Sequence, residues 1–169
     1  MSLVIYKYTP AGMLDAEMEA TFAARGHTLE YLLKSLRVQT HSGTLSSFVI
    51  TGPRGAGKSM LIHMVALRMR RDAELSAAWI PVMFPEEQFN VASLRDLLAV
   101  TLRVLSINES SAARTWLDTV EAEPNEEQSE QLAITGLKDV TRQSGKRLVL
   151  FVENLHVLLE QCLDDQMKG

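Results

Sequence analysis

The sequence has very little of what disulfide-bonded, membrane-spanning or nucleic-acid-binding proteins need. Cys162 is its only cysteine, which excludes an internal disulfide and fits a reducing compartment. No apolar run approaches the roughly 20 residues of a transmembrane helix, and residues 1–10 lack the apolar core and cleavage site of a secretion signal. The formal net charge of −4 argues against a dedicated basic surface for nucleic acid. These absences predict a cytoplasmic protein that does not span a membrane.

What is present is the composition of a globular domain. Hydrophobic residues make up 46% of the chain and charged residues 22%, as in ordinary folded proteins. A length of 169 residues is enough for one domain with a substantial core and too short for two ordinary ones. We therefore predict a single domain over residues 1–169, with a helical region at 1–45 and the main core at 46–169.

Strand-like and helix-like segments alternate along the chain. Short apolar runs at 47–51, 77–84 and 147–152 predict strands, and the last is continuously apolar, as in strands buried on both faces. Pro81 cannot donate a hydrogen bond, which places the second strand at a sheet edge. This alternation predicts an α/β fold with a parallel sheet. Helices are expected at 15–24, 28–36 (capped by Thr28), 58–71, 93–105 (capped by Ser93), 111–120, 126–143 and 155–163, and loops at 40–44 and 121–127.

One motif gives the chain its strongest functional signal. The stretch GPRGAGKS, from Gly52 to Ser59, fits G-x-x-x-x-G-K-[ST] without a mismatch. Its glycines let backbone N–H groups turn toward a phosphate chain without a Cβ clash. The helix that follows adds its N-terminal amides and the positive end of its dipole. We therefore predict a nucleotide-binding loop made of Gly52, Pro53, Arg54, Gly55, Ala56, Gly57, Lys58, Ser59 and Met60.

Two side chains of this loop have specific predicted roles. Lys58 is expected to reach the β- and γ-phosphates, and the Ser59 hydroxyl is expected to coordinate Mg²⁺. The alternative is an ordinary glycine-rich turn between a strand and a helix. The motif follows an apolar run and opens a helical pattern. That position favours the phosphate-binding loop, or P-loop.

A hydrolytic partner for the loop is predicted near the end of the chain. P-loop ATPases need an acid at the C-terminal end of a second buried strand, the end at which open α/β sheets bind ligands. The apolar run 147–152 is followed by Glu153 and Asn154. We predict that Glu153 joins Ser59 in holding magnesium, which makes Lys58, Glu153 and Asn154 the candidate catalytic residues. In the alternative interpretation, Glu153 is only a first-turn acid of the next helix.

These motifs together resemble the AAA+ ATPase group, most closely its origin-recognition-like and signal-transducing (STAND) branches. The resemblance rests on the P-loop, on the acid strand that follows after about ninety residues, and on the upstream helix with Arg25 and Leu29. It implies a three-layer P-loop sandwich that binds ATP and Mg²⁺, forms oligomers, and assembles or remodels a protein or nucleic-acid partner. Family members usually carry two acids at the strand end, the second of which activates water. Asn154 stands at that second position, so the resemblance implies binding but leaves hydrolysis open.

The resemblance also implies elements beyond those in the sequence. The family's sheet has fourth and fifth strands and a helical lid, which supply a polar sensor and arginines. We therefore expect the chain to be the N-terminal part of a larger ATPase, with its fold incomplete at the C-terminus. In the alternative, the acid strand pairs directly with the P-loop strand, as in nucleotide kinases and GTPases. Two other functions remain open: a small P-loop kinase acting on a small molecule, and a nucleotide-sensing module that does not hydrolyse.

Two further groups of side chains have ordinary structural interpretations. Arg68, Arg70 and Arg71 lie at the end of the predicted P-loop helix, where cations favour the helix dipole, and nucleic-acid contact is the alternative. The methionines are expected to fill gaps in the core.

Overall fold

The computed structural model of the chain describes residues 12–23, 25–84, 91, 93–108 and 110–155. The chain divides into two compact units, Met1–Trp79 and Ile80–Gly169. Within the described ranges, no helix is both long enough and apolar enough to cross a bilayer. The prediction that residues 1–169 form one domain stays a prediction.

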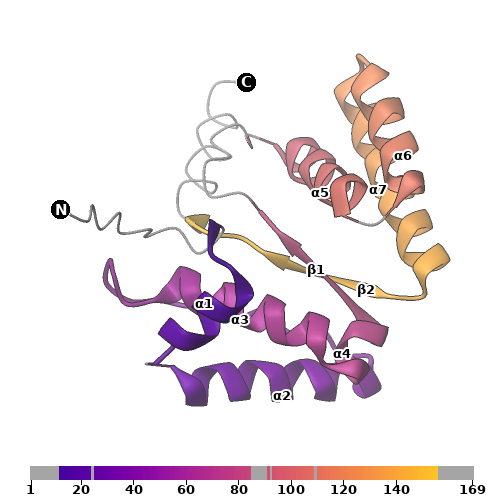
Figure 1. The fold of residues 1–169 in the computed structure, drawn as a ribbon. Coiled ribbons are helices and arrows are strands. Elements are labelled where there is room, and N and C mark those ends of the chain that lie inside the picture. Colours follow the sequence, from indigo (N-terminus) through magenta and orange to yellow (C-terminus); the bar gives the residue numbers. More distant parts are fainter. Residues whose placement is uncertain (1–11, 24, 85–90, 92, 109, 156–169) are drawn as a thin grey trace. The chain divides into compact units, whose positions relative to one another are not determined.

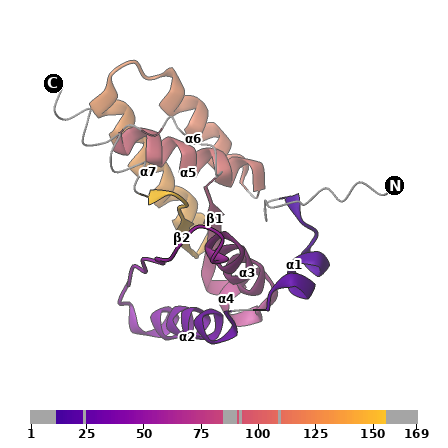
Figure 2. The ribbon, with the colours of Figure 1, turned by 90° about the vertical axis from the view of Figure 1, so that its left-hand side faces the viewer.

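The first unit contains four helices in the part that the structure describes. They are α1 (Asp15–Thr21), α2 (Gly26–Ser42), α3 (Lys58–Arg71) and α4 (Ala73–Ala78). Helix α2 contacts both α3 and α4 (Figure 2). It does so because its leucines recur at helical spacing and bury one face, whereas its other positions are mostly polar. The buried leucines of α2 are Leu29, Leu32, Leu33 and Leu36.

Helix α3 forms the centre of the first unit. Leu61, Met64 and Met69 are at most 1% exposed, which confirms a packing role for these methionines. The other side of α3 pairs with the acids of α1. Arg71 Nη1 lies 2.9 Å from Glu19 Oε1, and Arg68 Nη2 lies 3.3 Å from the same oxygen. Arg68 and Arg71 therefore have structural partners, which supports the helix-terminus interpretation over nucleic-acid contact.

Three predictions in the first unit are wrong. Thr28 does not cap α2, and residues 40–42 are not a loop, because the helix runs from Gly26 to Ser42 and ends at Gly43 with a left-handed φ of 70°. Residues 47–51 form no strand, although their sequence is apolar and β-branched. Among the described residues no strand pairs with this segment, and Val49 is 74% exposed. Strand propensity alone does not form a strand, because the ladder needs a partner.

Among its described residues, the second unit combines three helices with a small sheet. Its elements are β1 (Trp79–Met83, which starts at the last residue of the first unit), α5 (Leu94–Asn108), α6 (Ser111–Ala122), α7 (Glu126–Ser144) and β2 (Arg147–Phe151). The three helices pack against one another (Figure 1). Side-chain oxygens cap each of them at its N-terminus: Ser93 accepts from Asp96 N, Ser110 from Ala113 N and Asn125 from Gln128 N.

Close packing of α6 on α7 depends on a glycine. A Cβ added at Gly136 would lie 2.8 Å from the Cβ of Trp116, so no larger residue fits without a shift. The Trp116 indole N–H then donates to Asp139 Oδ2 at 3.1 Å. This bond is the largest cause that holds the pKa of Asp139 below its usual value. The acidic connection predicted at 121–127 is shorter than expected, because α6 and α7 extend into it.

Strands β1 and β2 pair in parallel, which confirms the α/β class with a parallel sheet. Pro81 lies in an edge strand as predicted, since both strands of a two-stranded sheet are edges. The prediction that the run 147–152 is buried on both faces is wrong: β2 is half-buried, and Leu150 is 43% exposed. Within the described residues, β2 does not pair with a P-loop strand, because residues 47–51 form no strand there and the partner of β2 is β1. The helix predicted at 155–163 lies almost entirely outside the described residues.

Candidate nucleotide-binding site

The backbone of the predicted loop turns at its glycines. Gly52, Gly55 and Gly57 have φ values of 151°, 79° and 73°, which residues with a Cβ rarely adopt. Gly57 is the N-cap of α3, so the helix starts at Lys58 as the sequence predicts. The glycines of the motif therefore stand where the chain needs positive φ, and the loop leads directly into a helix N-terminus.

Lys58 folds back over its own loop. Its ammonium donates to the carbonyl oxygens of Gly52 and Pro53 at 2.8 and 2.9 Å. An ammonium has three hydrogens to donate, so these two bonds fix its position and leave one hydrogen for a ligand. The loop thus holds a positive charge in place, and among the described residues no carboxylate forms an ion pair with it.

The start of α3 is suited to an anion. No side chain of the described part of the chain caps this helix, and its first turn contains no acid. The first intrahelical bond runs from Leu61 N to Gly57 O at 3.0 Å, so the amides before it point out of the helix end. Ser59 and Met60 lie half-buried in this first turn, whereas the Arg54 side chain is exposed in the loop. The helix dipole and these amides add to the positive field of Lys58.

The structure adds one cation that the sequence did not reveal as part of the site. A Cβ placed on Gly52 would lie 3.5 Å from Nη2 of Arg25, so this guanidinium lies against the loop. Arg25 is half-buried at the N-cap of α2. Among the residues that the structure describes, no carboxylate forms an ion pair with it. No local sequence signal identifies this contact, because it joins positions far apart in the chain.

Glu153 and Asn154 lie in the second unit, just after β2. Glu153 is half-buried in a bend, and Asn154 is exposed with a φ of 51°. Asparagine tolerates this left-handed conformation better than most residues, which gives Asn154 a backbone role besides any catalytic one. Leu155 is the first helical residue after β2, so Glu153 lies before that helical position. That Glu153 and Asn154 face the P-loop stays a prediction.

A comparison with protein-family models decides which family this loop serves. The model described as AAA ATPase domain matches residues 21–165, which include the loop, β2 and Glu153. The chain belongs to the AAA ATPase domain family. This AAA ATPase domain is accordingly an ATP-binding P-loop NTPase, as the resemblance implied. No curated protein and no solved structure matched it, and its branch within the family stays a prediction.

Proposed function

We propose that this AAA ATPase domain binds ATP with Mg²⁺ at residues 52–60 and couples binding to the assembly or remodelling of a macromolecular partner. One observation carries the proposal: the Lys58 ammonium is held by two loop carbonyls above a turn with three positive-φ glycines. A polyphosphate fits this arrangement because it needs a fixed cation together with several inward amides. In keeping with the family, we also propose a cytoplasmic protein that forms oligomers.

The residues of the loop fit the ligand in distinct ways. Lys58 would contact the β- and γ-phosphates, and the backbone amides of the loop would surround the phosphate chain. Ser59 and Glu153 are the proposed magnesium ligands, since Mg²⁺ prefers oxygen and is usually held by one or two side chains plus substrate phosphates. When bound, the metal would neutralise charge that develops on the phosphate oxygens.

Removing the Ser59 hydroxyl tests the magnesium part of the proposal. We expect Ser59→Ala to keep binding ATP but to lose the gain in affinity that Mg²⁺ gives, because it removes a metal ligand and no backbone donor. Calorimetric titrations with Mg²⁺ and with a chelator measure this difference. Ser47→Ala, an exposed serine of the same unit, is the control and should keep the full dependence. An unchanged dependence in Ser59→Ala would mean that other groups hold the metal.

We also propose that Arg25 acts as a second cation of the phosphate site. A guanidinium that lies half-buried against Gly52, without a carboxylate partner in the described residues, is suited to pair with a phosphate. We expect Arg25→Gln to weaken ATP binding by about 10-fold, since a hydrogen bond to a charged group contributes about 1.5–3 kcal/mol. Calorimetry measures the loss. Arg54→Gln, which removes an exposed charge from the loop itself, should have little effect, and equal losses would indicate a general electrostatic effect.

A second candidate function is a nucleotide-sensing module that binds ATP without turning it over. Asn154 favours it, because an amide cannot accept a proton from water at the position where the family usually has an acid. The third candidate function is a small-molecule kinase. The family match does not support it, because the matched family is one of ATPases. Phosphate release from the full-length protein separates the ATPase, which turns ATP over, from the sensor, which does not.

A further inference from the structure

Asp72 joins the P-loop helix to the next helix and serves both of them. Its backbone N–H donates to Arg68 O at 2.9 Å, which closes the C-terminal end of α3. Its Oδ1 accepts from Leu75 N at 2.9 Å, which caps the N-terminus of α4. The remaining oxygen, Oδ2, accepts from Nη2 of Arg37 at 2.6 Å. One carboxylate therefore fixes the end of α3 that lies opposite the P-loop, and α2 holds that carboxylate in place.

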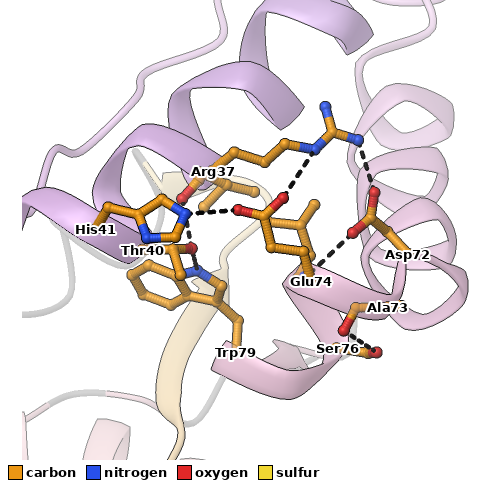
Figure 3. Close-up of polar contacts among 10 residues, drawn as sticks. Arg37, Thr40, His41, Asp72, Ala73, Glu74, Ser76 and Trp79 are labelled. Carbon is orange, nitrogen blue, oxygen red and sulfur yellow. Dashed lines mark hydrogen bonds and ion pairs between the residues drawn. The ribbon is translucent and has the colours of Figure 1, made fainter.

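Other side chains of α2 contact the same region (Figure 3). His41 Nε2 lies 2.9 Å from Glu74 Oε1 in α4, and the Trp79 indole N–H donates to Thr40 Oγ1 at 2.8 Å. Arg37 Nε also lies 3.9 Å from Glu74 Oε2. Positions 37, 40 and 41 share one face of α2, because they are three and four residues apart. This face of α2 thus holds α4 from its first turn to the residue that follows it.

Helix α2 also holds the chain that leads into the P-loop. Gln39 Oε1 accepts from Ser46 N at 2.9 Å, and the rings of Tyr31 and Phe48 meet edge to face with centroids 6.2 Å apart. Arg25, at the start of α2, lies against Gly52. The same helix therefore contacts the segment before the loop and the end of the helix after it.

This arrangement matters for a phosphate site because such sites need their donors fixed to a fraction of an ångström. Helix α3 has 14 residues and is about 21 Å long. A rigid helix that tilts at one end moves its other end, and here the other end carries Lys58 and the N-terminal amides. The Arg37 guanidinium is the largest cause that holds the pKa of Asp72 below its usual value, so the pair stays charged at neutral pH.

We propose that Arg37 is a positioning residue of the nucleotide site, which acts through Asp72 to fix the orientation of α3. The inference rests on the proposed function, because the quantity that Arg37 controls is affinity for ATP. The ion-pair partners of Arg37 in the described part of the chain are Asp72 and Glu74, which lie outside residues 52–60, so its effect is indirect. The contact is a regulatory point as well, since anything that releases Arg37 from Asp72 lowers that affinity.

Three variants of the 169-residue chain test the proposal by calorimetry with ATP and Mg²⁺. We expect Arg37→Gln and Asp72→Asn each to weaken binding by about fivefold, a typical size for coupling between two sites. Asparagine caps a helix as well as aspartate does, so Asp72→Asn keeps the cap of α4, whereas its NH2 group carries no charge and cannot accept from Arg37. The double variant should lose no more than either single one, because both break one interaction. Arg37→Lys should recover most of the affinity.

Arg103→Gln is the matched control. Arg103 Nη2 lies 2.6 Å from Glu121 Oε1, the same separation as in the Arg37–Asp72 pair, but it joins α5 to α6 in the second unit. This variant should lower the melting temperature about as much as Arg37→Gln does and leave ATP affinity unchanged. An Arg37→Gln chain that binds ATP as tightly as the wild type would overturn the proposal.

Hydrogen exchange separates this proposal from the proposed function. In nucleotide-free protein, Arg37→Gln should speed exchange of the Leu61 amide, whose bond to Gly57 O closes the first turn of α3, whereas Arg103→Gln should not. If the wild-type chain binds no ATP, the proposed function fails, and faster exchange at Leu61 still supports the positioning role of Arg37. Unchanged exchange at Leu61 would reject that role whether or not ATP binds.

Discussion

Replacing Lys58 with alanine is expected to abolish measurable ATP binding. Its ammonium is fixed over the loop by the carbonyls of Gly52 and Pro53, so it meets the phosphate charge without being reordered. Truncating one partner of a hydrogen-bonded charge pair costs about 2–5 kcal/mol, which corresponds to a loss of about 300-fold near the middle of that range. The variant also loses the two bonds that close the loop on itself, which adds to the loss.

Calorimetric titration with ATP and Mg²⁺ measures this effect, and thermal unfolding shows whether the fold survives. The hydrophobic core of the first unit does not involve the Lys58 side chain, so the melting temperature should change little. Lys34→Ala removes an exposed lysine from α2 in the same unit and should bind ATP normally. If Lys58→Ala binds ATP with unchanged affinity, residues 52–60 are not the nucleotide site.

The other large effect is expected on turnover, at Asn154. The wild-type chain should bind ATP with Mg²⁺ and hydrolyse it negligibly, because an amide stands where a general base is expected. Supplying a general base typically raises a rate by about 10²–10⁴. We therefore expect Asn154→Glu to raise phosphate release by about 10-fold or more, with part of the gain lost to imperfect placement.

The choice of control variants depends on the backbone conformation at position 154. Asn154 has a φ of 51°, and a left-handed conformation costs most other residues about 1–2 kcal/mol. Asn154→Glu should therefore be slightly less stable than the wild type. Asn154→Gly tolerates the same backbone but supplies no proton acceptor, so it should not raise turnover. Brisk hydrolysis by the wild-type chain, or a slower Asn154→Glu variant, would instead make Glu153 the base.

How far the sequence predicted the structure depends on whether the signal was local. Helix α3 was predicted with both ends correct, because Gly57 sets its start and the helical pattern continues to Arg71. The α/β class and the position of β2 followed from equally local patterns. The strand predicted at 47–51 failed because a strand depends on a distant partner, and none pairs with it among the described residues. The prediction that β2 is buried failed because burial depends on which distant elements pack on a strand, and β2 is only half-buried.

Some contacts around the site could not be predicted from the sequence, because they join residues that are far apart in the chain. The turns of the loop at its glycines and the start of α3 followed from a motif of fixed order, whereas the binding roles of its residues stay predictions. The contact of Arg25 with Gly52 is created by the fold, and nothing near either residue indicates it. The Arg37–Asp72 pair likewise joins two residues that are 35 positions apart in the sequence.

The three simultaneous bonds of Asp72 restrict how this position can change during evolution. A residue here must cap α4, which several small polar side chains do, and must also carry a negative charge for Arg37, which few of those do. In related chains we therefore expect the residue at position 72 to vary little. Where arginine at position 37 is replaced, we expect the residue at position 72 to differ as well.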